Sequence, residues 1–145
     1  MRPIRSFEDL DVWKVGREIR KDLYKLVDKL PKQEQYCLSR QVWTAAVSLT
    51  ANIAEGYGRF HYKENVQFCR IARGSAYELL DHLIACKDLG YLNATEHEAL
   101  NGQLTRFIQL INGYARSIGR ASEKSASDTN DDRRMTVDGS AREEH

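Results

Sequence analysis

Apolar and small residues recur at alternating spacings of four and three along four successive segments of the chain. A stripe with this rhythm lies on one side of an α-helix, whereas a half-buried strand alternates every second residue. The four stripes are Val12, Gly16, Ile19, Leu23, Leu26 and Leu30; Leu38, Val42, Ala45, Leu49, Asn52 and Gly56; Cys69, Ala72, Ala76, Leu79, Leu83 and Cys86; and Leu100, Leu104, Phe107, Ile111, Tyr114 and Ile118. They predict an all-α protein of four helices.

Residues that start or stop helices separate the four stripes. The predicted starts are a capping box of Ser6 with Asp9, residues 32–35, Tyr62, and a capping box of Thr95 with Glu98, and the predicted stops are Pro31, Gly56 with Gly58, Gly90 and Ala121. The connections are short, so we expect an antiparallel, up-down-up-down four-helix bundle. Gly16 is expected to let a neighbouring backbone come close. Small residues in the second half of the second predicted helix also predict a close helix–helix approach: Ala45, Ala46, Ser48, Ala51 and Ala54.

The sequence divides into a bundle domain, residues 1–120, and a polar tail. Residues 121–145 hold almost nothing apolar to bury, so we predict a disordered tail. The net charge of +1 divides into +4 for residues 1–120 and −3 for residues 121–145. No apolar run approaches the length of a membrane span and no signal-peptide pattern opens the chain, so we expect a cytoplasmic protein with no membrane partner.

The chain has three cysteines, Cys37, Cys69 and Cys86, and none forms a C-x-x-C pair. Cys69 and Cys86 belong to one predicted helix and lie about 25 Å apart by helical rise, too far for a disulfide. We expect reduced thiols that act as small core residues. Trp13, Trp43 and Tyr24 are interpreted as core or subunit-contact aromatics rather than a cofactor site.

Basic residues gather around the predicted corner between the second and third helices, at Arg59, Lys63, Arg70 and Arg73. Lys63 and Arg70 are seven residues apart and share a helix face. Residues 60–62 add three rings that can stack on bases. The pattern predicts a nucleic-acid-binding surface, and an ordinary solvated helix face is the alternative interpretation.

Four motifs follow one another along the chain: Phe7-Glu-Asp-Leu-Asp-Val-Trp13, Ala51-Asn-Ile-Ala-Glu-Gly-Tyr-Gly-Arg59, Ile71-Ala-Arg-Gly-Ser-Ala-Tyr-Glu78 and Leu89-Gly-Tyr-Leu92. Over about residues 6–118 the sequence resembles the bacterial four helix bundle protein family, whose founding members are encoded in intervening sequences of large-subunit ribosomal RNA genes. The resemblance implies a left-handed four-helix bundle that assembles into a ring, commonly a pentamer. Related accessory proteins of diversity-generating retroelements look like nucleic-acid-binding members of the same fold.

The resemblance also singles out Asn52, Glu55, Arg73 and Glu78. Asn52 and Glu55 fall on the inward side of the predicted second helix, where apolar residues are usual. An Arg73 guanidinium held near Glu55 would neutralise that inward carboxylate. We predict that the four residues form a structural polar cluster, and a binding role is the alternative.

Sites typical of bundle enzymes are missing from the sequence. A metal–carboxylate bundle needs Glu-x-x-His on two helices, and residues 1–120 contain none, since Glu78 and His82 are four apart. No Cys or Ser has an evident base partner, and no phosphate-binding Gly-Lys-Ser/Thr follows Gly56 and Gly58. We therefore expect no catalytic residue, metal, cofactor or small-molecule substrate.

Together these features favour a non-enzymatic, homo-oligomeric bundle that binds RNA or DNA through a repeated basic surface, without sequence readout. In a ring, each basic corner is repeated around one opening, and the summed field attracts phosphates. The alternative is a structural or protein-interaction module with no nucleic-acid ligand.

Overall fold

The computed structural model describes the backbone of residues 3–143 and the side chains of residues 3–130. Its elements are η1 (Phe7–Asp9), α1 (Asp11–Lys29), η2 (Lys32–Glu34), α2 (Leu38–Tyr57), α3 (Tyr62–Asp88) and α4 (Ala94–Glu143), where η denotes a short 3-10 helix. No strand occurs in the described part of the chain, so the predicted all-α fold is confirmed.

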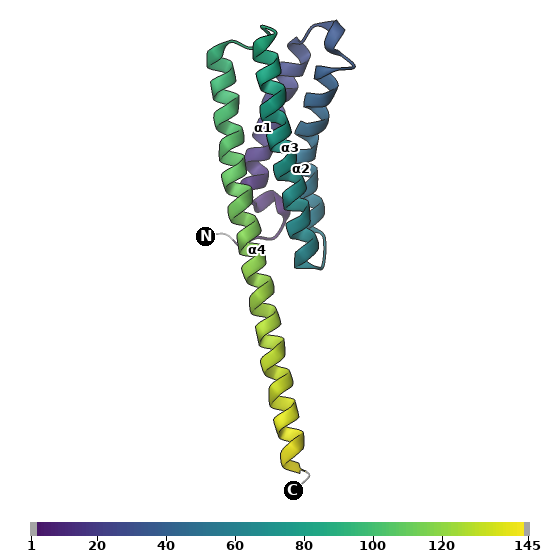
Figure 1. Ribbon diagram of the computed structural model, residues 1–145, viewed down its shortest axis with the longest axis vertical. Coiled ribbons are helices and arrows are strands. Elements are labelled where there is room, and N and C mark those ends of the chain that lie inside the picture. Colours follow the sequence, from purple (N-terminus) through teal and green to yellow (C-terminus); the bar gives the residue numbers. More distant parts are fainter. Residues whose placement is uncertain (1–2, 144–145) are drawn as a thin grey trace.

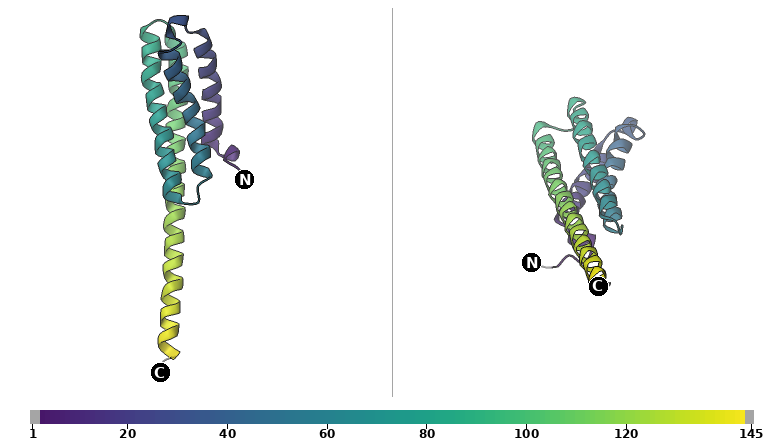
Figure 2. Two further views of the ribbon diagram at one scale, coloured as in Figure 1. Left: turned by 90° about the vertical axis from the view of Figure 1, so that its right-hand side faces the viewer. Right: turned by 60° about the horizontal axis from the view of Figure 1, so that its bottom comes forward.

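The four α-helices lie side by side and alternate in direction (Figure 1). The α1–α2 and α3–α4 connections lie at one end of the bundle, and the α2–α3 connection lies at the other, where α4 continues beyond its neighbours (Figure 2). Consecutive helices pack together, and α4 closes the bundle against α1. Within the described residues, no helix combines the length and the apolar character that crossing a membrane requires.

The predicted stripes form the core. Every stripe residue is buried except Leu30, Leu38, Asn52 and Tyr114, which are partly buried. Each helix contributes fully buried side chains, among them Ile19, Leu49, Leu79 and Phe107. Burying one such side chain contributes about 1.5–3 kcal/mol to the stability of the folded state. The predicted stripes therefore contain most of the side chains whose burial holds the helices together.

Two glycines allow close packing inside the bundle. A Cβ atom added to Gly16 would lie 3.0 Å from the Phe107 ring. A Cβ atom added to Gly56 would lie 2.7 Å from Asn65 Oδ1 and 2.8 Å from Phe68 Cβ. Gly16 was expected to admit a neighbouring backbone, but the space beside it is occupied by the side chains of Phe107 and Thr50. The helix stop predicted at Gly56 with Gly58 is confirmed at Gly58, which is the C-cap of α2, whereas Gly56 lies buried in the last turn and permits contact with α3.

The first residues of α1 and α2 differ from prediction because a 3-10 turn precedes each helix. The Ser6–Asp9 capping box forms, but it caps η1 rather than α1. Residues 32–35, the predicted start of the second helix, mostly form η2, and α2 begins at Leu38. A 3-10 turn is common at helix termini and uses the same capping residues, so the sequence pattern does not distinguish the two.

The α3–α4 connection uses one predicted and one unexpected signal. Gly90 adopts the left-handed conformation, with a φ of 80°, and ends α3 as predicted. The capping box of α4 is formed by Asn93 and Glu96, and not by Thr95 and Glu98. The Glu96 N–H donates to Asn93 Oδ1 at 2.8 Å, and the Asn93 N–H donates to Glu96 Oε1 at 3.2 Å. Asn is at least as good an N-cap as Thr, so the helix begins earlier.

The structure extends α4 as one helix to Glu143, where the sequence predicts a disordered tail from Ala121. Side chains 123–130 are all exposed, and the helix projects away from the bundle (Figure 1). This segment has no apolar stripe to pack, as the sequence indicates. Extending an existing helix costs little because each added residue gains one hydrogen bond. The remaining side chains of the predicted tail lie outside the described residues.

Candidate nucleic-acid interface

Lys63 and Arg70 lie two turns apart on the outer face of α3, near its N-terminus. Both side chains are exposed. Arg70 donates to Gln67 Oε1 at 3.3 Å, and within residues 3–130 no carboxylate forms an ion pair with Lys63 or Arg70. The shared face predicted from their spacing is confirmed, and both charges are available to a ligand.

A groove of about 510 Å³ lies beside these two residues, between α3 and the part of α4 that leaves the bundle. Its walls are Tyr62, Lys63, Val66, Gln67, Arg70, Gly119, Ser122 and Glu123. The Tyr62 ring is 46% exposed, and Glu123 contributes one negative charge. Arg116 and Arg120 are exposed on the same stretch of α4, so cations outnumber anions around the groove.

Arg59 lies at the same corner of the bundle, but its charge is already neutralised. Its guanidinium is 3.2 Å from Glu55 Oε1 and 3.9 Å from Glu64 Oε2. It also lies over the Phe68 ring, 5.1 Å from the ring centroid. The Arg59 side chain is 45% exposed, so solvent limits each pair to less than about 1 kcal/mol. Arg59 thus differs from Lys63, with which it was grouped in the sequence.

Arg73 is partly buried between α3 and α4. Its Nη1 donates to Asn112 Oδ1 at 2.9 Å. No ion pair between Arg73 and Glu55 occurs in the described part of the chain, so the predicted pairing is wrong. The reason is direction: Arg73 points toward α4, whereas Glu55 lies on α2 and binds Arg59. Arg73 therefore links α3 to α4 rather than joining the exposed cations.

Asn52 belongs to a different polar contact, between α2 and α3. Its Nδ2 donates to the carbonyl oxygen of Ser48 at 2.8 Å and to Ser48 Oγ at 2.7 Å. Ser48 Oγ lies 2.7 Å from Ser75 Oγ on α3. A small hydroxyl on each helix lets the two backbones approach while their polar groups stay hydrogen-bonded. The structural role predicted for Asn52 fits these contacts, although its partners are serines.

Glu55 and Glu78 lie on the outside of the bundle, so the predicted four-residue cluster does not form. The Glu55 side chain is 54% exposed and the Glu78 side chain 47%. Glu78 Oε1 is 3.0 Å from His82 Nε2. Ile53 and Gly56 are the buried positions of this part of α2, so Glu55 faces outward. Among the described residues, no three or more His, Cys, Asp or Glu side chains gather as a metal site would require.

Two further contacts across helices were not predicted. Arg20 Nη1 donates to Thr50 Oγ1 at 2.8 Å, joining α1 to α2. Asn65 Nδ2 donates to the Tyr114 hydroxyl at 3.3 Å, joining α3 to α4. Burial raises the pKa of Tyr114, and the hydrogen bond from Asn65 opposes that rise. Tyr114 stands in a stripe, which signals that its hydroxyl needs a partner, but the sequence does not indicate which one.

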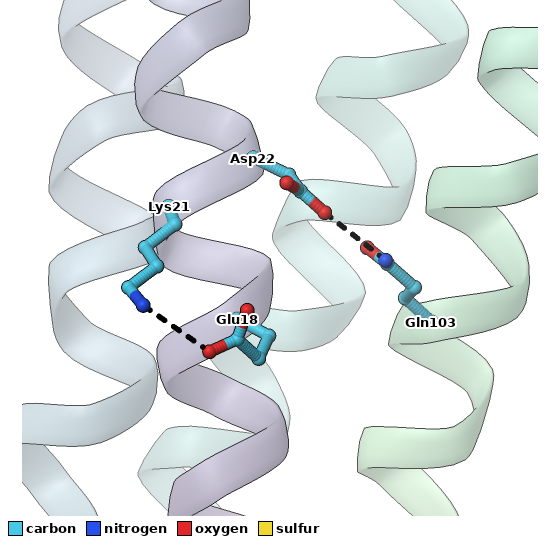
Figure 3. Close-up of polar contacts among 4 residues, drawn as sticks. All are labelled: Glu18, Lys21, Asp22 and Gln103. Atoms are coloured by element: carbon cyan, nitrogen blue, oxygen red, sulfur yellow. Dashed lines mark hydrogen bonds and ion pairs between the residues drawn. The ribbon is translucent and has the colours of Figure 1, made fainter.

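A polar contact also joins α1 to α4, where the last helix closes the bundle. Asp22 and Gln103 point toward one another (Figure 3), and Gln103 Nε2 donates to Asp22 Oδ2 at 3.0 Å. On the same helix as Asp22, Lys21 pairs with Glu18 at 3.3 Å. The Lys21–Glu18 pair has the i, i+3 spacing that a sequence reveals, whereas the Asp22–Gln103 contact spans 81 residues.

The three thiols differ in environment. Cys69 and Cys86 are buried as predicted, and burial raises the pKa of each from 9.0 to about 11. They are therefore poor nucleophiles at neutral pH. Cys37 was also expected in the core, but it is exposed, because it lies in the turn that precedes α2.

Comparison with known proteins supports the fold. The family model described as "23S rRNA-intervening sequence protein" matches residues 8–113. A solved structure of a protein of unknown function from the S23 ribosomal protein family of Bacteroides thetaiotaomicron has a TM-score of 0.67 and 21% identity, covering 72% of this chain and 97% of that chain. No curated protein matches the chain significantly. The matched residues cover most of the bundle, and the chain belongs to the 23S rRNA-intervening sequence protein family.

Proposed function

We propose that this protein is a non-enzymatic bundle that binds the phosphate backbone of RNA or DNA in the groove between α3 and α4. The observation that carries the proposal is the exposed pair Lys63 and Arg70, which has no acidic partner within residues 3–130. An ion-paired cation such as Arg59 must give up a carboxylate to bind phosphate. Lys63 and Arg70 give up no carboxylate, although Arg70 can exchange its hydrogen bond to Gln67 for one to phosphate, and binding releases counterions from the nucleic acid.

The spacing of the two cations suits a nucleic-acid strand. Seven residues of α-helix rise by about 10.5 Å, so Lys63 and Arg70 can contact different phosphates of one strand. Tyr62 adds a ring on which an unpaired base can stack. Such contacts neutralise phosphates and do not read base edges. Glu123 opposes binding, so Glu123→Gln is expected to strengthen it.

We also propose that several copies assemble and repeat the groove around one centre. Support comes from Val47 and Ile71, which are 36% and 45% exposed on α2 and α3. Val47 directly precedes Ser48, and Ile71 lies one helical turn before Ser75. Contact with another copy would cover both side chains. Light scattering should then give a multiple of the 16.7 kDa chain mass, and a single-chain mass would contradict assembly.

The nucleic-acid proposal is tested by titrating a structured RNA at about 50 and 200 mM salt. The variant Lys63→Ala/Arg70→Ala removes the two proposed phosphate contacts. The control Lys25→Ala/Lys29→Ala removes the same charge from exposed positions on α1. Each lost contact with duplex should reduce the slope of log affinity against log salt by about 0.9, so the first variant should lose about 1.8. The control should keep the wild-type slope.

Equal slopes for the wild type and both variants would contradict the groove as the binding site. No binding even at low salt would contradict the nucleic-acid function altogether. That second result would favour the structural or protein-interaction module, in which the assembled bundle holds other proteins.

A further inference from the structure

A second hollow lies at the α1–α2 connection and has about 560 Å³ of space. This volume falls within the roughly 300–1,000 Å³ typical of small-molecule sites. Its walls are Tyr24, Val27, Asp28, Leu30, Pro31, Lys32, Gln35, Tyr36, Ser39, Arg40 and Trp43. The α1–α2 connection lies at the end of the bundle opposite to the projecting part of α4 (Figure 1), so this pocket is distant from the Lys63–Arg70 groove.

Three aromatic rings line the pocket: Tyr24 and Tyr36 are exposed, and Trp43 is partly buried. Tyr24 and Trp43 meet edge to face, with ring centroids 4.1 Å apart and an angle of 89° between planes. Tyr24 is still 55% exposed, and Tyr36, in the turn before α2, is 78% exposed. Large rings left this exposed in one concave site offer flat faces for stacking a planar aromatic group.

The charges around the pocket favour an anionic ligand. Lys32 and Arg40 contribute two positive charges and Asp28 contributes one negative charge. Within residues 3–130, neither cation forms an ion pair. Aromatic rings alone would also suit an organic cation, but the net positive rim opposes one. Ser39 lines the pocket as well, and its hydroxyl can bond to a polar ligand edge.

We propose that this pocket binds a nucleotide, with the base stacked on the Tyr36 and Trp43 rings and the phosphate held by Lys32 and Arg40. Interleaved aromatic and basic side chains are the chemistry by which proteins hold single-stranded nucleic acid. The nucleotide can be a free mononucleotide or an unpaired nucleotide of a strand. The site does not depend on the proposed function, since no residue is shared with the α3–α4 groove.

Tryptophan fluorescence tests the proposal, because the chain has only two tryptophans. In a Trp13→Phe background, Trp43 alone reports on the pocket. Titration with AMP or with a short oligoadenylate at equal nucleotide concentration should quench Trp43 as a base stacks. Quenching by AMP indicates a free-nucleotide site, and quenching by the oligoadenylate alone indicates a strand site. A Trp43 signal unchanged by either probe would overturn the proposal.

Pocket variants decide whether the quenching arises from the named contacts. Tyr36→Ala should weaken binding about tenfold or more by removing a stacking face, and Arg40→Ala should weaken AMP but leave adenosine unchanged. Equal binding of AMP and adenosine to the wild-type pocket would overturn the phosphate contact. Trp13 packs on Phe7, with ring centroids 5.3 Å apart, so the Trp13→Phe background alters this contact. Equilibrium dialysis of AMP against the unsubstituted protein therefore provides a second measurement.

Failure of the pocket and failure of the groove are distinguishable. Lys63→Ala/Arg70→Ala should leave the Trp43 response unchanged, and Tyr36→Ala should leave the salt dependence of structured-RNA binding unchanged. Loss of the Trp43 response in the groove variant would contradict two separate sites.

Discussion

Gly56→Ala gives a sharp test of how α2 and α3 pack where they approach the candidate interface. The new Cβ would lie 2.7 Å from Asn65 Oδ1, 2.8 Å from Phe68 Cβ and 3.3 Å from the Asn65 carbonyl oxygen. The Asn65 amide can rotate only by disturbing its hydrogen bond to Tyr114. Phe68 Cβ cannot rotate away, because it moves only with the α3 backbone.

The magnitude follows from two opposing terms. Overpacking of a tight site costs about 1–3 kcal/mol, and the short contact to Phe68 Cβ places Gly56→Ala near the upper value. Replacing Gly by Ala within a helix returns about 1 kcal/mol. The net loss of unfolding free energy is therefore about 2 kcal/mol. With a urea m-value of about 2 kcal/mol/M, the unfolding midpoint should fall by about 1 M.

Gly74→Ala is the matched control, because nothing lies within 4 Å of its added Cβ and it is exposed on α3. Only the helix-propensity term remains, so its midpoint should rise by up to about 0.5 M. The assay is urea unfolding followed by circular dichroism at one protein concentration. A Gly56→Ala midpoint equal to or above that of the wild type would refute the packing described here.

Three further predictions concern the partly buried arginine and the thiols. Arg73→Met should lower the unfolding free energy by about 1–3 kcal/mol because it leaves Asn112 without its donor. The double variant Arg73→Met/Asn112→Leu should recover part of that loss. If the effects of the two substitutions on the unfolding free energy, measured by urea unfolding, simply add, the contact is contradicted. Native protein should expose one reactive thiol, Cys37, to a thiol reagent, and rapid labelling of all three would contradict the burial of Cys69 and Cys86. Since burial raises both pKa values from 9.0 to about 11, the folded state holds more protons than the unfolded state between these values, so the unfolding free energy should fall as pH rises above about 9.

The architecture was predictable because the spacing of apolar residues is a direct consequence of helical geometry. Phe107 and Leu79, for example, are fully buried, and their stripes place them there without knowledge of their neighbours. Gly90 was also predictable, since a left-handed residue after a helix favours glycine. Gly56 resembled the same signal, but the sequence does not reveal that α3 occupies the space beside it.

The candidate site was predictable in part. The helical spacing of Lys63 and Arg70 correctly indicated a shared face. Arg59 and Arg73 belong to the same charged stretch, but one is paired with carboxylates and the other is bonded to α4. Which partner a cation finds depends on the rotation of neighbouring helices, and a stripe fixes that rotation only to within about one residue. Glu55 was assigned to the inward face for this reason.

The aromatic pocket was missed for a related reason. Tyr24 and Trp43 belong to different helices, and their sequence positions indicated core or subunit-contact residues. Their ring contact and the exposure of Tyr24 depend on how α1 and α2 pack against one another, which the sequence does not show. Tyr36 and Arg40 lie near the start of α2 and give no periodic signal, so only the folded chain brings them together.

Crosslinking of bound structured RNA, followed by mass spectrometry of the crosslinked peptides, tests the central claim most directly. If the phosphate backbone lies in the groove between α3 and α4, crosslinks should fall on the peptide that carries Tyr62 and Lys63 and on the stretch around Gly119. Crosslinks confined to other faces of the bundle, with that peptide unmodified, would contradict the proposed interface.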